Sequence, residues 1–594
     1  MKNIKKIAIT MAILLVAVVL LRVTALTVTS MEVAHGELKG QNLSPAIGLG
    51  SSISGIMPSM SMSMDAAVAG NTIGFSVGGA KDINNFRENI ENGYFPISTD
   101  ITINGLFYDY YFETGNSGKA SDELFSPAYS VALSRDPISN KLEYYITVGL
   151  NSNIKESDFV RKKLNLVVAL DISGSMGSGF NSYYYDDPLK YENEYKSKMR
   201  VANESLNVLL DQLKDDDRFG LVLFESTATK MKDLELIEET DIERLKQRIL
   251  QIQDTGGTNF EAGYIEATDL LDEYVGADSD EYENRIIVIT DAMPNTGRTD
   301  REGLIGMVED NADNGIYTTF IGVGVDFNTE LIQTISDVRG ANYYSVHSSD
   351  EFEERMGEQF EYMVTPLVFD LELELDSDDY EIEAVYGSDT VDKKSGTIME
   401  VNTLFPSKSE GGEVKGGVIL LKLEKKNNKE EGELELKVTY KDRNGKKHQN
   451  EQTIEIVADG EERYDNTGVR KAIMLTRYAN TLKNWILYER SEERKFLIRP
   501  EIGICDCMIV EPEEVYKLLG EWERASVELT VSDEYKEIFK DLKEYMEEEM
   551  EVLDDDALEQ EIDILKELIK HKNKLIEIEK PILRPIEEPI NVWF

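Results

Sequence analysis

The sequence predicts an α/β protein in which a doubly wound, mostly parallel sheet is flanked by an antiparallel β region and by a C-terminal helical region. Three observations support this fold class. Between residues 162 and 363, short apolar runs typical of buried parallel strands alternate with segments of helical periodicity. Between residues 366 and 457, apolar and polar side chains alternate, as in antiparallel strands. From residue 467 onward the periodicity is helical again.

The alternating segments of the α/β unit can be placed one by one along the chain. Strands are expected at 164–170, 219–224, 286–290, 317–323 and 343–347. Helices are expected at 199–214, 242–252, 260–274, 301–314, 329–338 and 350–363. Because a helix between two parallel strands forms a right-handed crossover, the carboxyl ends of these strands should lie along one common edge of the sheet.

The flanking regions carry patterns of their own. Two candidate strands at 129–133 and 144–149 precede the α/β unit, and we expect them to join the antiparallel region, with the α/β unit inserted between. Helices are expected at 83–92, 469–488, 513–523 and 534–572. The predicted parts are a signal peptide or N-terminal anchor at 1–28, a flexible linker at 29–70, an N-terminal extension with strands joining a β domain at 71–161, the α/β domain at 162–363, a β-sandwich-like region at 364–460, a helical region at 461–580 and a tail at 581–594.

The N-terminus carries a basic segment followed by an apolar run. Three lysines among the first six residues precede an uninterrupted apolar stretch at 7–21, and Arg22 and the small residue Ala25 follow. This order is typical of a secretory signal peptide. The stretch is short for a membrane-spanning helix, and a retained anchor through 7–28 is the alternative. In both cases the rest of the chain is expected to be extracytoplasmic, either secreted or anchored to the cytoplasmic membrane and facing outward.

The composition argues against several classes of function. The formal net charge of −50 argues against a nucleic-acid partner, because phosphate binding needs a basic surface. The four histidines are isolated, and Cys505 and Cys507 are the only cysteines, so neither a zinc finger nor a disulfide framework is expected. The sequence contains no nucleophile elbow and no P-loop, and we expect a protein that is not an enzyme.

Oxygen-bearing side chains follow two of the expected strands at the point where each strand ends. Asp171 ends the first strand of the α/β unit, and Ser173 and Ser175 follow it at alternate positions. Asp291 follows a later strand, and Thr258 lies in a glycine-rich loop that leads into a helix. Carboxylates and hydroxyls are hard ligands, which suit Mg²⁺, Ca²⁺ or Mn²⁺ better than zinc. The sequence therefore predicts a divalent metal site at the carboxyl edge of the parallel sheet.

These motifs resemble the metal-ion-dependent adhesion site of von Willebrand factor type A domains. The resemblance rests on D-I-S-G-S at 171–175, G-G-T-N at 256–259 and T-D at 290–291, which occur in the order found in the family, and it covers about 162–363. The flanking regions resemble those of secreted or membrane-attached prokaryotic proteins of this family, which carry a dedicated N-terminal extension and C-terminal domain. Inter-alpha-trypsin inhibitor heavy chains share a looser version of the architecture.

The resemblance implies metal-dependent protein binding. It implies that Ser173, Ser175 and Thr258 contact the metal directly or nearly so, whereas Asp171 and Asp291 act partly through water. In family members a Glu or Asp of the partner becomes a metal ligand, so we expect an adhesion or binding protein whose partner presents a carboxylate. The alternative is a membrane-anchored regulatory or scaffold subunit of an envelope channel, protease or other complex.

An enlarged loop follows the first metal motif and is rich in aromatic residues. Aromatic side chains are enriched at interfaces, so Tyr183, Tyr184 and Tyr185 are candidates for a rim that contacts the partner. One alternative is that this loop folds against its own domain. Another is that Asp186 or Asp187 approaches the metal and occupies its open position from within the same chain.

Overall fold

The structure is a computed structural model of the chain. The described residues are 72–115, 124–137, 139–186, 196–277, 281–357, 359–387, 390–392, 398–427, 431–457, 460–496, 502–503, 509–510 and 519–573. The expected signal peptide or anchor, the linker, the tail, Asp187 and both cysteines lie outside the described residues.

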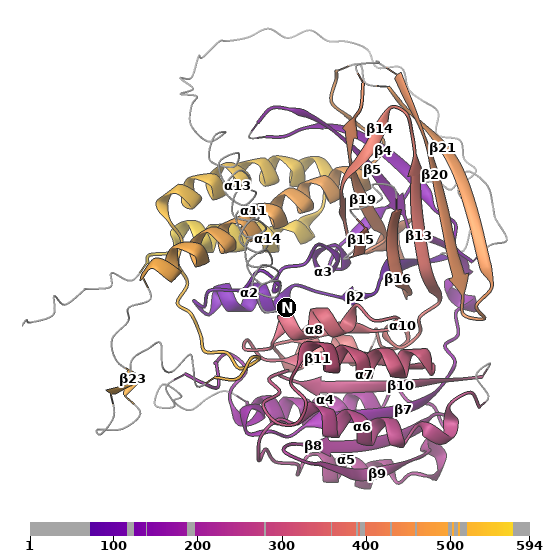
Figure 1. Ribbon diagram of the computed structural model, residues 1–594, viewed down its shortest axis with the longest axis vertical. Helices are drawn as coiled ribbons and strands as arrows, with labels where there is room; N and C mark the ends of the chain where they lie inside the picture. The colour runs from indigo at the N-terminus through magenta and orange to yellow at the C-terminus, as the bar shows by residue number, and fades with distance from the viewer. Residues whose placement is uncertain are drawn as a thin grey trace, which may run out of the picture. The chain divides into compact units, whose positions relative to one another are not determined.

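A seven-stranded sheet forms the α/β unit, in the strand order β2-β12-β11-β10-β7-β8-β9 (Figure 1). All neighbouring strands in it are parallel except β8 and β9, which are antiparallel. The strands are β2 (Gly79–Ala80), β7 (Lys163–Asp171), β8 (Arg218–Phe224), β9 (Ala228–Leu236), β10 (Tyr282–Thr290), β11 (Ile316–Val323) and β12 (Asn342–Val346).

Helices cover both faces of this sheet, which explains why its central strands are continuous apolar runs. One face packs against α4 (Lys198–Leu210), α5 (Ile242–Ile249), α9 (Ser349–Met356) and α10 (Phe360–Met363). The other face packs against α6 (Phe260–Asp269), α7 (Arg301–Asp313) and α8 (Thr329–Ser336). The α/β fold class with a mostly parallel sheet is therefore confirmed.

Two strands of this sheet were not expected from the sequence. The edge strand β9 is largely solvent-accessible and carries few apolar side chains, so it lacks the apolar run that marks the buried strands. The other edge strand, β2, contains only two residues and comes from the segment before the α/β unit. A strand this short has no periodicity to detect.

The antiparallel region consists of two sheets that enclose a common apolar core. The first has the order β21-β20-β13-β16-β1-β6, with β15 also paired to β16, and the second has the order β14-β19-β5-β4-β22. The first sheet contains β1 (Thr72–Val77), β6 (Asn151–Lys155), β13 (Val368–Asp376), β15 (Thr390–Asp392), β16 (Ile398–Ser407), β20 (Glu431–Asp442) and β21 (Lys447–Val457). The second contains β4 (Ala128–Arg135), β5 (Leu142–Gly149), β14 (Tyr380–Tyr386), β19 (Val418–Lys425) and β22 (Arg463–Tyr464).

Strands from before and after the α/β unit pair directly in both of these sheets. β1 pairs with β16, and β5 pairs with β19. The α/β unit is thus inserted into the chain between two halves of one antiparallel assembly. Smaller sheets are formed by β3 (Tyr111–Glu113), β17 (Ser409–Glu410) and β18 (Glu413–Lys415), and by β23 (Ile502–Gly503) and β24 (Ile509–Val510).

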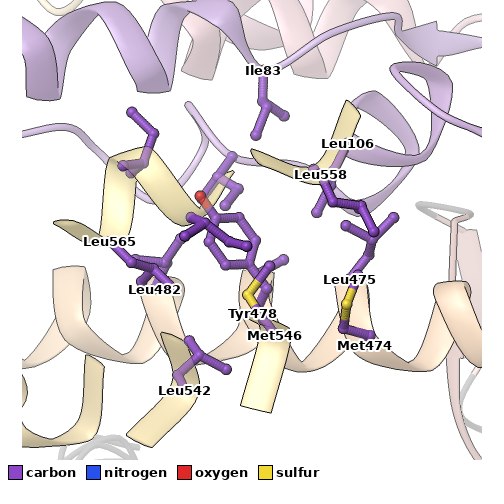
Figure 2. Packing of buried hydrophobic residues seen from close by; sticks show 14 of the residues in the cluster. Ile83, Leu106, Met474, Leu475, Tyr478, Leu482, Leu542, Met546, Leu558 and Leu565 are labelled. Carbon is purple, nitrogen blue, oxygen red and sulfur yellow. The ribbon is translucent and has the colours of Figure 1, made fainter. Parts of the chain in front are cut away.

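A third core lies among helices from both ends of the described chain (Figure 2). It joins α2 (Asn84–Glu91) and α3 (Ile103–Tyr108) to α11 (Thr467–Phe496), α13 (Asp533–Leu553) and α14 (Glu559–Lys570). Figure 2 labels Ile83, Leu106, Met474, Leu475, Tyr478, Leu482, Leu542, Met546, Leu558 and Leu565 within this cluster.

The C-terminal helices differ from the expectation in two places. The single helix expected at 534–572 is interrupted, because Asp554 adopts a left-handed conformation with a φ of 52° and ends α13. The side chain of Asp555 then accepts a hydrogen bond from the backbone of Ala557 and starts a new turn. In the expected helix at 513–523, residues 519–523 instead form a bend and a turn. Among the described residues, no helix is both long and apolar enough to cross a membrane.

Candidate functional site

The predicted site residues gather where β7 and β10 end, at the carboxyl edge of the parallel sheet (Figure 1). Asp171 is the last residue of β7, and Ser173 and Ser175 follow in a short 3₁₀ turn at Gly174–Gly177. Asp291 follows directly after β10, which is the neighbour of β7 in the sheet. The adjacency of the two strands brings both carboxylates to one place.

Both carboxylate oxygens of Asp171 are held by hydrogen bonds. Oδ1 accepts a bond of 2.8 Å from the backbone amide of Ser173, and Oδ2 accepts one of 2.6 Å from the hydroxyl of Thr290. The Thr290 hydroxyl in turn accepts from the backbone amide of Ala292 at 2.9 Å. Asp171 therefore has a fixed orientation and ties the end of β7 to the end of β10.

The two serine hydroxyls point toward each other. Ser173 Oγ and Ser175 Oγ lie 3.0 Å apart, in a loop that the glycine-rich segment holds in place. The amide of Gly174 donates to the carbonyl of Gly256 at 3.1 Å. Gly256 has a φ of 72°, and a Cβ there would lie 2.2 Å from the carboxylate of Glu225, so this close approach needs glycine.

The glycine-rich segment also fixes Thr258 beside the loop that follows β10. The amide of Thr258 donates to the side-chain oxygen of Asn295 at 2.9 Å, and the amide of Asn295 donates to the carbonyl of Thr258 at 3.0 Å. Thr258 is 2% exposed and begins the turn into α6. The three motifs are therefore joined by side-chain and backbone hydrogen bonds into one cluster at the sheet edge.

Lys198 is a member of this cluster that sequence reasoning missed. Its ammonium lies 2.9 Å from Asp291 Oδ2 and 2.7 Å from Asp326 Oδ1, and all three side chains are fully buried. Within the described part of the chain, the other oxygen of Asp291, Oδ1, is buried and has no hydrogen-bond partner. The lysine is the first residue of α4 in the sequence K-S-K-M-R, where nothing distinguishes it from its basic neighbours.

The electrostatics of the cluster favour the binding of a cation. Burial, reinforced by the nearby charge of Asp291, raises the pKa of Asp171 to about 7. Burial also raises the pKa of Asp326, although Lys198 opposes the shift. When ionised, three carboxylates against one ammonium leave two negative charges in excess in a buried place. A divalent cation would balance that charge.

The donor set fits a hard metal ion bound mainly through hydroxyls. Among the described residues, no group of three or more His, Cys, Asp and Glu side chains is arranged to hold a metal. The cluster instead offers three hydroxyls, from Ser173, Ser175 and Thr258, together with the unpartnered oxygen of Asp291. Such oxygen ligands suit Mg²⁺, Mn²⁺ or Ca²⁺.

The three loop tyrosines have different surroundings. Tyr183 is 1% exposed and donates a hydrogen bond of 2.6 Å to Asn89 of α2, so this ring packs against its own chain. Tyr185 donates to the carboxylate of Glu523, and Tyr184 is 42% exposed. Of the three rings, Tyr184 presents the largest free surface to a partner.

Comparisons with known proteins agree with this architecture. Residues 166–293 match the family model described as "von Willebrand factor type A domain". Inter-alpha-trypsin inhibitor heavy chain H2 of Mus musculus is 23% identical over 207 residues, which cover 34% of this chain and 20% of that protein. Heavy chain H1 of Sus scrofa is 24% identical over 219 residues, covering 36% and 22%. The matches span about a fifth of the length of these relatives.

The solved structures that resemble this chain are more distant. A von Willebrand factor type A protein from Catenulispora acidiphila shares 15% identity at a TM-score of 0.40, covering 68% of this chain and 99% of that chain. Proximal thread matrix protein 1 of the mussel byssus, with a zinc-occupied metal-ion-dependent adhesion site, shares 15% identity at a TM-score of 0.25, covering 34% and 46%.

Proposed function

Because this chain carries a von Willebrand factor type A domain, we propose that it is an extracytoplasmic binding protein that recognises a partner's carboxylate through a divalent metal ion. Mg²⁺ is the first candidate for the metal, with Mn²⁺ and Ca²⁺ as alternatives. The residues proposed to hold it are Asp171, Ser173, Ser175, Thr258 and Asp291.

The observation that carries this proposal is the buried oxygen Oδ1 of Asp291, which has no hydrogen-bond partner among the described residues. Burying a carboxylate oxygen without a partner is costly, and binding a cation removes that cost. The oxygen belongs to the same residue that Lys198 anchors through its other oxygen, so it is held in a fixed direction. The hydroxyls of Ser173 and Ser175, 3.0 Å apart, are the proposed neutral ligands, and they follow β7, the strand next to β10 that Asp291 follows.

The chain's own residues set the chemistry of recognition. A bound divalent ion would supply an electrophilic centre for a carboxylate oxygen of the partner. The hydroxyl ligands carry no charge, so they add nothing to the two negative charges already in excess at the buried carboxylates. Asp171, with both oxygens already hydrogen-bonded, also acts as a support for the loop. This arrangement favours a strong, directional contact to an Asp or Glu side chain of another protein.

Binding rather than catalysis is the activity supported by these contacts. Among the described residues, Asp171, Asp326 and Lys198 are engaged in buried hydrogen bonds, and the Asp291 oxygen that lacks a partner is the one proposed to bind the metal. A hydrolytic site would need a base free to accept a proton from water. The extracytoplasmic setting rests on the basic and apolar order of the first 25 residues.

The test of metal binding is thermal unfolding of the full chain with Mg²⁺ and with a chelator. A metal that binds the folded state at 100 times its Kd stabilises it by about 2.7 kcal/mol. We expect Mg²⁺ to raise the Tm of the wild type and of the control Asp376→Asn, an exposed position of β13, but not that of Asp171→Asn. An equal shift for Asp171→Asn would place the metal elsewhere.

The test of recognition is affinity capture of envelope proteins by wild type and Asp171→Ala, each with Mg²⁺ and with chelator. A partner recognised through the site should be recovered only by wild type with Mg²⁺. Recovery of the same partners in all four conditions would contradict metal-dependent recognition.

A further inference from the structure

The five proposed metal ligands are almost inaccessible in this structure. Their exposures are 0% for Asp171, 1% for Ser173, 6% for Ser175, 2% for Thr258 and 0% for Asp291. A carboxylate of a partner protein can approach a metal held by these side chains only if the segments packed around them leave the ion's open position free. Residues 520–526, in the C-terminal helical region before α13, contact the loops around these side chains.

We propose that residues 520–526 form an autoinhibitory strap that closes the carboxyl edge of the parallel sheet, with Glu523 as its latch. The inference rests on the proposed function, since it names a segment that the partner's carboxylate must displace. It assigns a regulatory role to a region more than two hundred residues after the last metal motif.

The strap contacts three of the loops at this edge. It meets the loop after β7 through Tyr185 and Asp186, the loop after β10 through Asn295 and Thr299, and the loop after β11 through Phe327 and Asn328. Every one of these contacts is a hydrogen bond. The strap therefore links these three loops to one another.

A short chain of hydrogen bonds links Glu523 to the proposed metal ligand Thr258. Its Oε1 accepts a hydrogen bond from the hydroxyl of Tyr185 and one of 3.0 Å from the side-chain amide of Asn295. The oxygen of that same Asn295 amide accepts from the backbone of Thr258 at 2.9 Å. One asparagine side chain thus separates the strap's carboxylate from a proposed metal ligand.

Both carboxylate oxygens of Glu523 accept hydrogen bonds. Oε2 accepts from the backbone amide of Gly520 at 2.6 Å, so both oxygens have donors. Burial and the hydrogen bond to Glu523 raise the pKa of Tyr185, which keeps that phenol protonated as a donor. The edge of the sheet therefore already binds one carboxylate, which belongs to the chain itself.

Trp522 and Arg524 anchor the strap on either side of the latch. The Trp522 ring is 2% exposed within the core that covers one face of the sheet, and its Nε1 donates to the carbonyl of Thr299 at 2.7 Å. Arg524 donates to the carbonyl of Phe327 at 3.0 Å. Trp522 is held by its burial and by a main-chain acceptor, and Arg524 is a cation that also lies 3.9 Å from Asp100. Glu523 is the carboxylate of the strap in this network, so it is the part that a competing carboxylate can replace.

The test measures whether loss of the latch opens the site to a carboxylate probe. The probe is an acetylated and amidated Gly-Glu-Gly peptide, titrated into the full chain loaded with Mn²⁺ and followed by the relaxation of water protons, since an entering carboxylate displaces bound water. We expect Glu523→Gln and Tyr185→Phe to bind the probe about tenfold more tightly than the wild type, the equivalent of about 1.4 kcal/mol. Glu521→Gln, an exposed neighbour that loses the same charge, should bind it as the wild type does.

Hydrogen exchange supplies a second readout on the wild type. Saturation with the probe should increase deuterium uptake across 520–526, where the amides of Gly520 and Ser526 are hydrogen-bonded in the closed form. The autoinhibitory role of the strap would be contradicted if the probe bound all variants with equal affinity. It would also be contradicted if probe binding left the deuterium uptake of residues 520–526 unchanged. Absence of Mn²⁺ binding that depends on Asp171 would instead overturn the proposed function itself. If Mn²⁺ binds but the probe binds to no variant, both the recognition of a carboxylate by the metal and the autoinhibitory role of the strap are contradicted.

Discussion

The ammonium of Lys198 lies 2.9 Å from Oδ2 of Asp291, and neither side chain has any solvent exposure. The same ammonium contacts Asp326 at 2.7 Å. The pair engages one oxygen of Asp291 and leaves the other, Oδ1, buried and without a hydrogen-bond partner among the described residues. Lys198 therefore restrains the orientation of a proposed metal ligand without being a proposed ligand itself.

Replacing Lys198 with Met should destabilise the metal-free protein. Removal of one partner of a buried ion pair costs about 3–5 kcal/mol, because the remaining charges are left unpaired. A divalent cation can compensate the three buried carboxylates, so Mg²⁺ should raise the Tm of Lys198→Met more than that of the wild type. Lys196→Met removes an exposed lysine two residues away and serves as the control. Equal metal-induced shifts in all three proteins would show that Lys198 does not act at the metal site.

Replacing Ser175 with Ala should weaken metal binding without unfolding the protein. The substitution removes one hydroxyl ligand, and changes of this kind lower metal affinity on the order of tenfold or more. The Kd for Mn²⁺, measured by electron paramagnetic resonance, is the readout. Ser182→Ala, in the same loop and bonded only to the carbonyl of Gly179 among the contacts described, should leave the Kd unchanged. A similar Kd for both variants would remove Ser175 from the ligand set.

Replacing Arg87 with Met should destabilise the protein by about 3–5 kcal/mol. Arg87 of α2 donates to the fully buried Glu561 of α14 at 3.1 Å, so the variant leaves a buried carboxylate without its cation. The double variant Arg87→Met/Glu561→Leu should recover much of this loss, which denaturant unfolding can measure. For comparison, Arg200→Met at a surface pair should cost about 0–1 kcal/mol. If the losses caused by Arg87→Met alone and by Glu561→Leu alone simply add up in the double variant, the two side chains are not energetically coupled.

Acidification should destabilise the protein through His347. Burial lowers the pKa of His347 to about 4, and within the described chain neither ring nitrogen has a hydrogen-bond partner. Asp82 and Asp100 act in the opposite direction but do not outweigh burial. The pKa of His347 is lower in the folded protein than in the unfolded chain. The contribution of the neutral imidazole to the free energy of unfolding is therefore complete above about pH 6.5 and is lost as the pH falls toward 4.

The matched variant for this pH effect is His347→Met. Between pH 7 and pH 4 the wild type should lose about 3 kcal/mol more free energy of unfolding than His347→Met. Denaturant titrations at the two pH values measure the difference. Parallel losses in both proteins would assign the acid sensitivity to other groups.

Most of the α/β unit could be predicted from the sequence, because its strands are long, apolar and bounded by turns. The five expected strands correspond to β7, β8, β10, β11 and β12. The edge strands β9 and β2 were not predicted. β9 has one face in solvent and lacks a continuous apolar run, and β2 is too short for any pattern of apolar residues to be recognised. The break at Asp554 was also missed, because a left-handed residue leaves the helical periodicity on either side intact.

The sequence by itself determined which oxygen-bearing side chains stand at strand ends, because strand pattern and chain position are local properties. Asp171 and Asp291 could therefore be named together without knowledge of any contact. Only the tertiary structure decided which distant groups meet them. Lys198 lies 93 residues from Asp291, and Glu523 lies 338 residues from Tyr185. Nothing in the local sequence marks the partner of a lysine among other basic residues or of a glutamate in an acidic segment. These side chains meet their partners only because segments that are remote in the sequence pack together.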